Sequence, residues 1–487
     1  MAMKKVTLNQ PSSISTNLSV DEKSAYYNMR QMDWSTIGII MQGERAVRAA
    51  GQRFVPILSK QTSTEYAAYL SRGSFYNAFA RTVQGLTGAI TRKPVVLELP
   101  EKMEDISDNF TKDGISIDKT VRDITQEIIS QGYCGMLADL DDKGKPYASV
   151  YSPLDIYNFR LVEKEGQKVL AMLALHEIAE EIDGLDYFKI NQIDQIRVLS
   201  LDELGWLTVN LYRYDVQIKG GNKKWIQVPI RGEYDYHPTT VGGLKLDYIP
   251  FVFFGADKTS FIPQKPPLLD LVYLNIKHWQ VSVDYYYALH ICALPTPWAA
   301  GFDQIEGKEL KIGSGTAWVS KTPEAKCGFL EFTGQGLGAI EKALDRLERQ
   351  MAVIGARFLE EQKKGVEAVE TLEIRSSGDT ANLASISVSI EQGFKQILIY
   401  MAKWIKVDWD KIEVTLSKDF VSAKMEPAMI TALLGALQAN RISIDTFLYS
   451  LQEGEILPTN VTIEDEKAKL ELKEQENPYL PSLSQEE

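Results

Sequence analysis

Hydrophobic residues recur at helical spacing along two long stretches of the sequence, 268–292 and 336–363. The spacing predicts two helices, and at ~1.5 Å of rise per residue they would span about 37 and 42 Å. In the first stretch the hydrophobic positions cover more than one face, so such a helix must be buried on several sides. The two helices therefore predict a rod with a small head, covered by neighbouring copies of the chain.

The rest of the sequence predicts a mixture of helices and strands. Helical spacing marks 20–91, 117–131 and 379–405, with shorter helices near 427–439 and 443–451, and Ser116 is placed to cap the helix that follows it. Alternating or continuous hydrophobic runs between turns predict strands across 155–255. Short strands are also expected at 95–99, 136–140, 147–151, 317–320, 329–332 and 411–416. The sequence therefore predicts an α+β fold.

The composition of the chain indicates its general class and the cellular compartment in which it is made. The chain has 487 residues, 44% of them hydrophobic, and a net charge of −13, so we expect it to fold around a core and not to grip a polyanion over its whole surface. Cys134, Cys292 and Cys327 form no CxxC pair, which favours a reducing compartment without disulfides. No signal peptide and no hydrophobic run of membrane-spanning length is visible, so we expect synthesis in the cytoplasm and no membrane partner.

The motifs of common enzymes are missing from the sequence. No Walker-type GxxxxGK[ST] is present, and the glycines at 334, 336 and 338 are better explained as a hinge into a helix than as a dinucleotide loop. The segment 139–150 imitates an EF-hand but has Val150 where a carboxylate is required, which favours a hairpin turn. The four histidines lack zinc spacing. We therefore expect no catalytic residues, no cofactor and no metal site.

One basic spot suggests contact with a nucleic acid. Lys363 and Lys364, followed by Gly365, end the second long helix. Cations at this position suit the C-terminal end of a helix dipole, and that explanation is sufficient by itself. The alternative is that the two lysines lie on a loop that projects toward a DNA backbone.

Three sequence segments together resemble a known family. They are YAAYLSRGSFYN at 66–77 with its continuation RTVQGLTG at 81–88 and RKP at 92–94, GYCGMLAD at 132–139 with KPY at 145–147 and YSP at 151–153, and EIRSSGDTANL at 373–383. Because these segments occur together, and because the order of the elements matches over roughly residues 20–470, the chain resembles the portal proteins, or head-to-tail connectors, of tailed bacteriophages. None of these segments is catalytic.

The resemblance implies a division of the chain into parts. It implies the portal fold, with an α/β wing, a two-helix stem, a small β-containing clip and a helical crown. The segments would be a flexible N-terminal arm at 1–19, the wing at 20–265, stem helices at 266–293 and 336–363 around a clip at 294–335, a tunnel loop at 364–378, a wing or channel helix and strand at 379–423, the crown at 424–475 and a disordered tail at 476–487. The stem helices would pack through Trp279, Tyr286, Leu344, Leu347 and Met351.

The resemblance also implies a function and partners. It implies a homo-oligomeric ring of about twelve copies in the virion, at one capsid vertex, through which double-stranded DNA passes non-specifically during packaging and ejection. The partners would be the large subunit of terminase, then head–tail adaptor or tail proteins, and capsid or scaffold proteins. The alternatives are another ring- or pore-forming component of a phage or secretion machine, and a nucleic-acid-processing enzyme with an atypical site.

Overall fold

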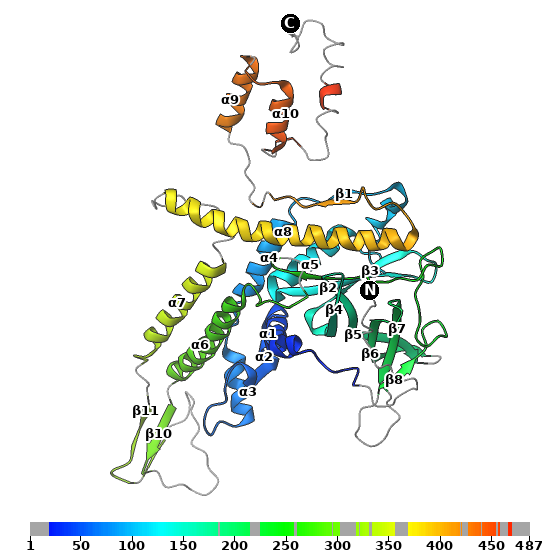
Figure 1. Ribbon diagram of the computed structural model, residues 1–487. Helices are drawn as coiled ribbons and strands as arrows, with labels where there is room; N and C mark the ends of the chain where they lie inside the picture. The colour runs from blue at the N-terminus through cyan, green and yellow to red at the C-terminus, as the bar shows by residue number, and fades with distance from the viewer. Residues whose placement is uncertain are drawn as a thin grey trace. The chain divides into compact units, whose positions relative to one another are not determined.

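The structure, a computed structural model, describes most of the chain in two compact units, Met1–Lys418 and Asp419–Glu487 (Figure 1). The described residues are 19–183, 186–214, 225–257, 261–294, 296–301, 318–320, 322–330, 334–355, 369–418, 420, 427–439, 441–453, 456–457 and 466–469. The first unit combines helices with antiparallel sheets. The predicted α+β fold class is therefore confirmed.

The first unit begins with four helices, α1 (Ala25–Met41), α2 (Glu44–Ala50), α3 (Ser63–Arg72) and α4 (Ala78–Ile90). Polar side chains start three of them. Ser24 accepts a hydrogen bond from the backbone N–H of Tyr27, and Asn77 accepts one from Ala80. Thr62 and Glu65 form a reciprocal capping box at α3. The helical pattern predicted for 20–91 is therefore confirmed.

Helix α5 (Ile117–Gln131) leads into a three-stranded sheet. As predicted, Ser116 caps the helix by accepting a hydrogen bond from the Lys119 N–H, and Gly132 ends it at a φ of 75°. The strands are β2 (Tyr133–Leu140), β3 (Pro146–Tyr151) and β9 (Phe251–Gly255), in the order β3-β2-β9. The segment that imitates an EF-hand is the β2–β3 hairpin, in which the Asp141 carboxylate accepts hydrogen bonds from the N–H groups of Lys143 and Lys145.

The second sheet has five antiparallel strands in sequence order, β4 to β8. Their bounds are Ile156–Lys164, Gln167–Asp183, Asp186–Leu201, Leu207–Tyr214 and Trp225–Val228. The predicted strands do not include β4 as a segment of its own. After the buried Ile156, its residues are half-buried or exposed and do not alternate cleanly between two faces. The core between the sheets and helices contains large, fully buried side chains, among them Trp34, Tyr133 and Phe254.

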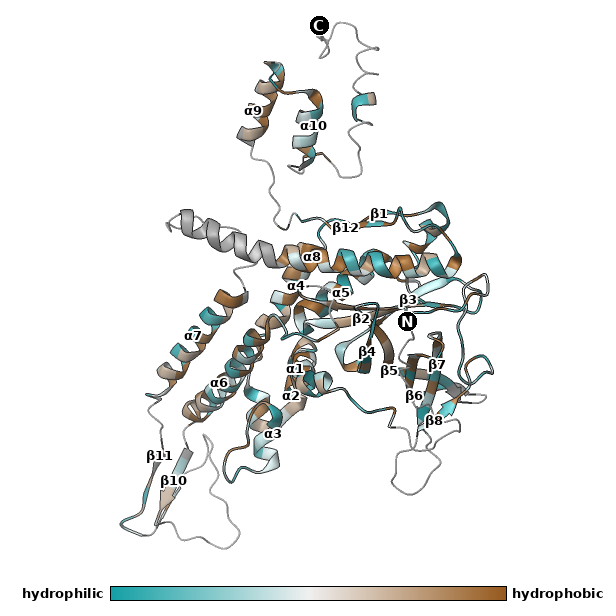
Figure 2. Cartoon of the chain, viewed as in Figure 1, coloured by the Kyte–Doolittle hydropathy of each residue, from teal (hydrophilic) through white to brown (hydrophobic). Residues whose placement is uncertain are grey.

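Helices α6 (Leu269–Ala293) and α7 (Leu337–Gly355) lie side by side. Between them in sequence come β10 (Thr296–Ala300) and β11 (Lys326–Leu330), an antiparallel pair at one end of the two helices. Hydrophobic residues recur along both helices (Figure 2). The predicted strand at 317–320 is wrong for its described residues, since 318–320 form no strand. Strand β10 is absent from the predicted strands, because proline argues against a strand. In the structure Pro297 pairs opposite Phe329 at the edge of a two-stranded sheet, where its missing N–H is tolerated.

Helix α8 (Val369–Ile405) is longer than predicted, because it begins before residue 379, and part of the segment predicted to be a loop is therefore helical. Its C-terminal half packs on β2, β3, β9 and α5. Strand β12 (Glu413–Thr415) then pairs with β1 (Val96–Glu98). Both short strands were predicted, but their pairing was not. The second unit contains α9 (Pro427–Gln438) and α10 (Ile444–Glu453), which contact each other.

Two titratable groups near the start of β4 predict a pH dependence of stability. Burial, with Asp155 and Asp123 nearby, raises the pKa of Glu127 to about 7. Hydrogen bonds from His176 to Asp155 and Asp194, at 3.3 and 3.2 Å, raise the pKa of His176 above its ordinary value despite partial burial. Both groups bind protons more tightly in the folded state than in the unfolded state. Their contribution to the free energy of unfolding is therefore fully present at low pH, and it is lost as the pH rises through their folded-state pKa values.

We therefore expect the free energy of unfolding to fall between about pH 5 and pH 8, by roughly 2 kcal/mol from Glu127. Glu127→Gln should flatten this dependence and make the protein more stable than wild type at pH 8. The exposed Glu163→Gln is the matched control and should change nothing. Urea denaturation at several pH values measures the effect, and an unchanged slope in Glu127→Gln would contradict it.

Candidate stem surface and a polar cavity

One side of α6 is anchored to the N-terminal helices by polar side chains. The Asn275 side chain accepts a hydrogen bond from the Phe79 N–H at 3.0 Å and donates one to the Tyr76 carbonyl at 2.8 Å. Ser282 accepts from the Ser74 N–H at 3.1 Å and donates to its carbonyl at 2.9 Å. These contacts pair backbone groups of Ser74 and Tyr76, which connect α3 to α4, and of Phe79 in α4, and so fix α6 in one register.

Trp279, predicted to pack in a two-helix stem, is fully buried within the single chain. Its ring lies 5.9 Å from that of Phe75 in an edge-on arrangement, and the Arg48 guanidinium lies 5.9 Å from the ring centroid. Gly73 makes this packing possible, because a Cβ there would lie 2.8 Å from Trp279 and 2.5 Å from Val283. The sequence showed Gly73 only as part of a helical pattern, without this role.

Helix α7 is held to α6 and α4 at two points. His278 Nε2 lies 3.2 Å from the Glu348 carboxylate, so the two helices share a polar contact. Near the end of α7, Met351 is buried, and Gly355 lies so close to Thr82 and Leu271 that a Cβ would overlap the Thr82 hydroxyl. The glycine therefore lets α7 approach α4 closely.

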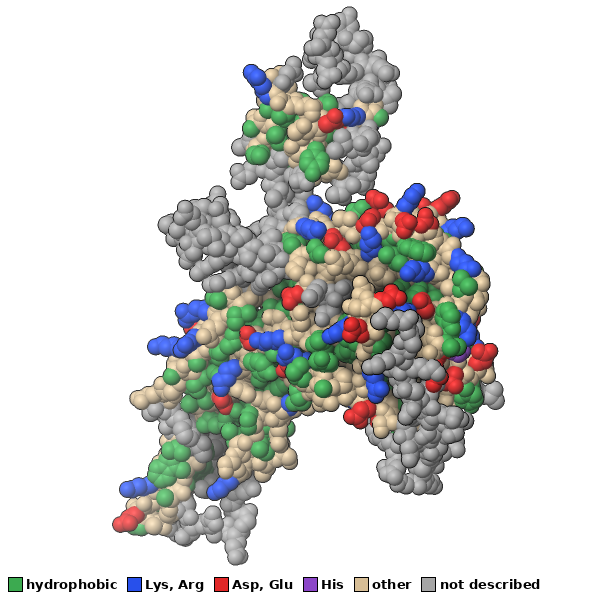
Figure 3. Space-filling view, in the orientation of Figure 1, with side chains coloured by type: hydrophobic (Ala, Val, Ile, Leu, Met, Phe, Trp, Pro, Cys, Tyr) green, Lys and Arg blue, Asp and Glu red, His purple; other side chains and the backbone are tan. Residues whose placement is uncertain are grey.

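The other predicted stem residues remain at least partly accessible in the single chain. Leu344 and Leu347 are half-buried, and Tyr286 is 40% exposed. Val353 is 47% exposed and lines a groove together with Leu274 and Ile354, bordered by Lys342, Arg346 and Arg349. Figure 3 shows hydrophobic side chains gathered over α6 and α7. The helix pair thus presents an apolar surface that the described part of the chain leaves uncovered.

The basic spot at Lys363, Lys364 and Gly365 lies outside the described residues. The structure therefore does not place it against the helix pair.

A partly buried polar network lies where the two larger sheets meet, and no sequence motif marked it. The Arg197 guanidinium donates to Glu177 at 2.8 Å and to Asp139 at 3.3 Å, and the Tyr151 hydroxyl donates to Glu177 at 2.6 Å. Burial alone would raise the pKa of Glu177, but Arg197 holds it below its ordinary value. Burial and the Glu177 charge raise the pKa of Tyr151. The network is therefore a satisfied ion pair that joins β2, β3, β5 and β6.

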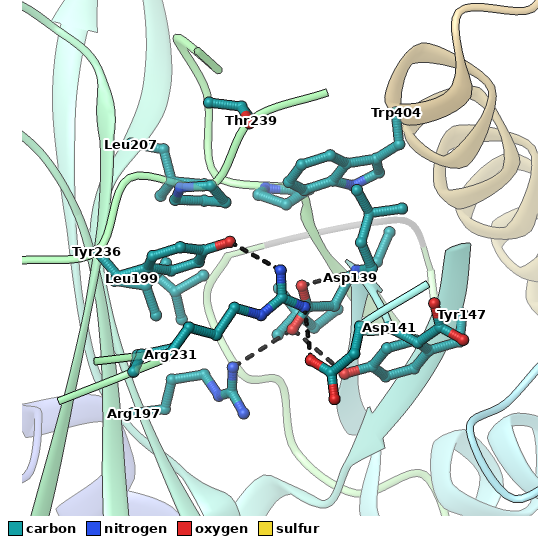
Figure 4. A pocket seen from close by; sticks show the side chains of 18 of the residues that line it. Asp139, Asp141, Tyr147, Arg197, Leu199, Leu207, Arg231, Tyr236, Thr239 and Trp404 are labelled. Carbon is teal, nitrogen blue, oxygen red and sulfur yellow. Dashed lines mark hydrogen bonds and ion pairs between the residues drawn. The ribbon is translucent and has the colours of Figure 1, made fainter. Parts of the chain in front are cut away.

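A cavity of about 290 Å³ adjoins this network. Figure 4 shows Asp139, Tyr147 and Arg197 on one side, the Arg231 guanidinium projecting across the space, and the indole of Trp404 from α8 as another wall. Arg231 donates to the Tyr236 hydroxyl at 3.2 Å and pairs with Asp142 at 3.0 Å. Strands β2, β3, β6 and β7, the segment at 230–239 and α8 thus line one pocket that is partly open to solvent.

Among the described helices, none combines the length and the hydrophobicity that a membrane-spanning segment requires. Within the described residues, no group of histidine, cysteine, aspartate or glutamate side chains is arranged to hold a metal ion.

Comparison with protein families gives one match. A family model described as a domain of unknown function, DUF4055, matches residues 267–405, which span α6 to α8 and include β10 and β11. No curated protein matches the sequence.

Solved structures from gene transfer agent (GTA) particles are also similar. A chain in the virion of the native particle has 11% sequence identity, covers 85% of this chain and 99% of its own, and has a TM-score of 0.37. A chain in the neck of the native particle with C12 symmetry has 11% sequence identity, covers 85% of this chain and 100% of its own, and has a TM-score of 0.34. A chain in the neck of the empty particle with C6 symmetry has 10% sequence identity, covers 82% of this chain and 96% of its own, and has a TM-score of 0.38. Because these scores and identities are low, the likeness defines neither the fold nor the function of this chain.

Proposed function

We propose that this chain is a portal protein, which forms a ring of about twelve copies at one capsid vertex and conducts double-stranded DNA during packaging and ejection. One observation carries the proposal beyond the resemblance in sequence. The long pair α6 and α7 leaves Tyr286 and Val353 exposed and Leu344 and Leu347 half-buried. An apolar surface of this kind on a helix pair is suited to burial against an identical neighbour.

The ring serves as a conduit and has no catalytic role. Its clip would contact the large subunit of terminase first and head–tail adaptor or tail proteins later, while other surfaces meet capsid or scaffold proteins. The net charge of −13 suits a channel that must not retain its cargo, because a negative wall repels phosphates. The second candidate is another ring- or pore-forming component of a phage or secretion machine, which the same apolar surface would serve.

Native mass spectrometry of the purified chain tests the proposal. We expect masses of a large, closed homo-oligomer at micromolar concentration over a range of salt concentrations. A stable monomer or dimer under all these conditions would contradict it. Reproducible nuclease or ATPase turnover with divalent metals would contradict the non-catalytic role.

The tunnel-loop hypothesis predicts a separate effect of Lys363 and Lys364. Their joint replacement by alanine should leave the oligomer intact and impair packaging or retention of DNA, because transient contacts with phosphates are lost. The matched control is Lys168→Ala, an exposed lysine at the start of β5. DNA packaging in an assembled system measures the effect, and normal packaging by the double variant would remove the basis for a tunnel loop here.

A further inference from the structure

Helix α7 carries a row of positive charge on its outer surface. Lys342, Arg346 and Arg349 are all exposed, and their spacing of four and three residues places them on one face of the helix. Figure 3 shows lysine and arginine side chains over α7. In the described part of the chain, neither Lys342 nor Arg346 forms an ion pair, and Arg349 donates a hydrogen bond to the backbone carbonyl of Asp345 at 3.2 Å. We call these three residues the basic row.

A row of negative charge runs beside it on the same helix. Glu341, Asp345 and Glu348 repeat the same spacing one residue earlier, so this acidic row is turned by about 100° around the helix from the basic row. All three side chains are exposed, and Glu348 faces His278 of α6 at 3.2 Å. Within the described residues Glu341 forms no ion pair. Helix α7 therefore has two flanks of opposite charge.

The two signs are segregated in a way that an isolated helix does not favour. At three or four residues from Arg346, the charged neighbours are Lys342 and Arg349. The charged neighbour of Glu341 at this spacing is Asp345. Like charges at this spacing destabilise a helix, whereas opposite charges stabilise it. A second surface that brings the opposite charge to each row would therefore offset both repulsions.

An apolar strip accompanies the basic row. Val353 continues the row four residues after Arg349, is 47% exposed, and lines a groove with Leu274 and Ile354. Protein interfaces commonly combine a hydrophobic centre with a polar rim. A cationic rim requires a partner with exposed carboxylates, and the acidic row of another copy of the chain supplies them.

We propose that neighbouring copies of the chain meet through α7, with the basic row of one copy facing the acidic row of the next. The two rows lie on different flanks of one helix, so the contact is heterologous, and its repetition around an axis gives a ring of identical interfaces. The complementary rows would fix the order and orientation of adjacent copies. This inference rests on the proposed ring and adds the surface that selects the neighbour.

Reversal of the charges in each row tests the inference. Lys342→Glu with Arg346→Glu makes both rows net negative, and Glu341→Lys with Asp345→Lys makes both rows net positive. Each double variant alone should need at least tenfold more protein than wild type to form rings at low salt, because like charges then meet at every interface. A 1:1 mixture of the two variants should recover rings near the wild-type concentration, because each negative copy then lies between two positive copies.

Native mass spectrometry measures the result, and the recovered rings should contain equal numbers of the two variants. Circular dichroism checks that each variant is folded. Two control pairs make the same changes of net charge at exposed positions away from α7, and both should assemble as wild type does: Glu163→Lys with Glu203→Lys, and Lys143→Glu with Lys168→Glu. High salt should narrow the difference between wild type and the row variants, because it screens exposed charges.

Two results would overturn this inference and leave the portal proposal standing. The first is normal ring formation by either folded row variant alone; if such rings of Lys342→Glu with Arg346→Glu also retained less DNA, the basic row would face the channel instead. The second is a 1:1 mixture that forms no more rings than its two components do. Wild-type chains that form no rings would contradict both proposals.

Discussion

Gly393→Ala should destabilise the protein by roughly 2 kcal/mol. Gly393 lies on the face of α8 that meets β9, and a Cβ there would lie 2.7 Å from Phe254 Cζ and closer still to Cε1. Phe254 is fully buried and packs edge-on against Phe394 at 5.7 Å, so its ring has no free space to move into. Alanine favours a helix over glycine by ~1 kcal/mol, but overpacking a core of this density costs more.

Gly38→Ala is the matched control for this experiment. Gly38 also lies within a helix, α1, but a Cβ there meets nothing within 4 Å. This variant should be unchanged or more stable by up to about 1 kcal/mol. Urea denaturation of both variants measures the difference, and Phe254→Leu should restore part of the stability lost in Gly393→Ala. Equal stability of the two alanine variants would contradict the close packing of α8 on β9.

Val353→Asp should prevent ring formation while leaving the single chain folded. Val353 is 47% exposed and lines the groove on the α6–α7 pair, so a carboxylate there is hydrated in the monomer. In a ring in which a neighbour covers this surface, the same carboxylate would lose its hydration, and pairing with Arg349 at the border of the groove would offset only part of that cost. Leu347→Asp should have the same effect on assembly with some loss of monomer stability, because Leu347 is half-buried.

Leu204→Asp provides the matched control, since Leu204 is 81% exposed in the turn between β6 and β7, away from the helix pair. Size-exclusion chromatography with light scattering reports assembly, and circular dichroism reports folding. Rings that form normally from folded Val353→Asp would show that the groove on α6 and α7 is not an interface.

The sequence predicted those elements whose local pattern agrees with their tertiary surroundings. Helix α5 has a cap at Ser116, a regular apolar face and Gly132 at its end, and its predicted bounds match the structure. The β2–β3 hairpin has two hydrophobic runs around a turn rich in aspartate and glycine, and it too was predicted. Each of these signals acts within a few residues, so it can be read without the fold.

Elements that depend on distant contacts were predicted less well. Ser377, Gly378 and Asp379 are typical of a helix start, yet α8 already includes them. Strand β10 contains Pro297, which argues against a strand until its pairing with β11 is known. Local propensity is a weak prior, and here the tertiary structure overrides it.

The site was less predictable than the fold. Trp279 and Met351 were expected to pack in a stem, and the structure shows that they are buried within their own chain, whereas Tyr286 and Val353 face outward. Which hydrophobic residues of a helix meet the same chain depends on contacts such as that of Gly73 with Trp279, which join positions far apart in sequence. The network of Glu177 and Arg197 likewise joins two strands through their pairing register, which alternation alone does not reveal.

Negative-stain electron microscopy of the purified wild-type chain tests the central claim most directly. A portal protein predicts views down a symmetry axis that show closed rings with a central channel, wide enough for duplex DNA, and the same rings should be missing from Val353→Asp. A field of small, separate particles from the wild-type chain, at concentrations and salt conditions where it is folded, would contradict the account.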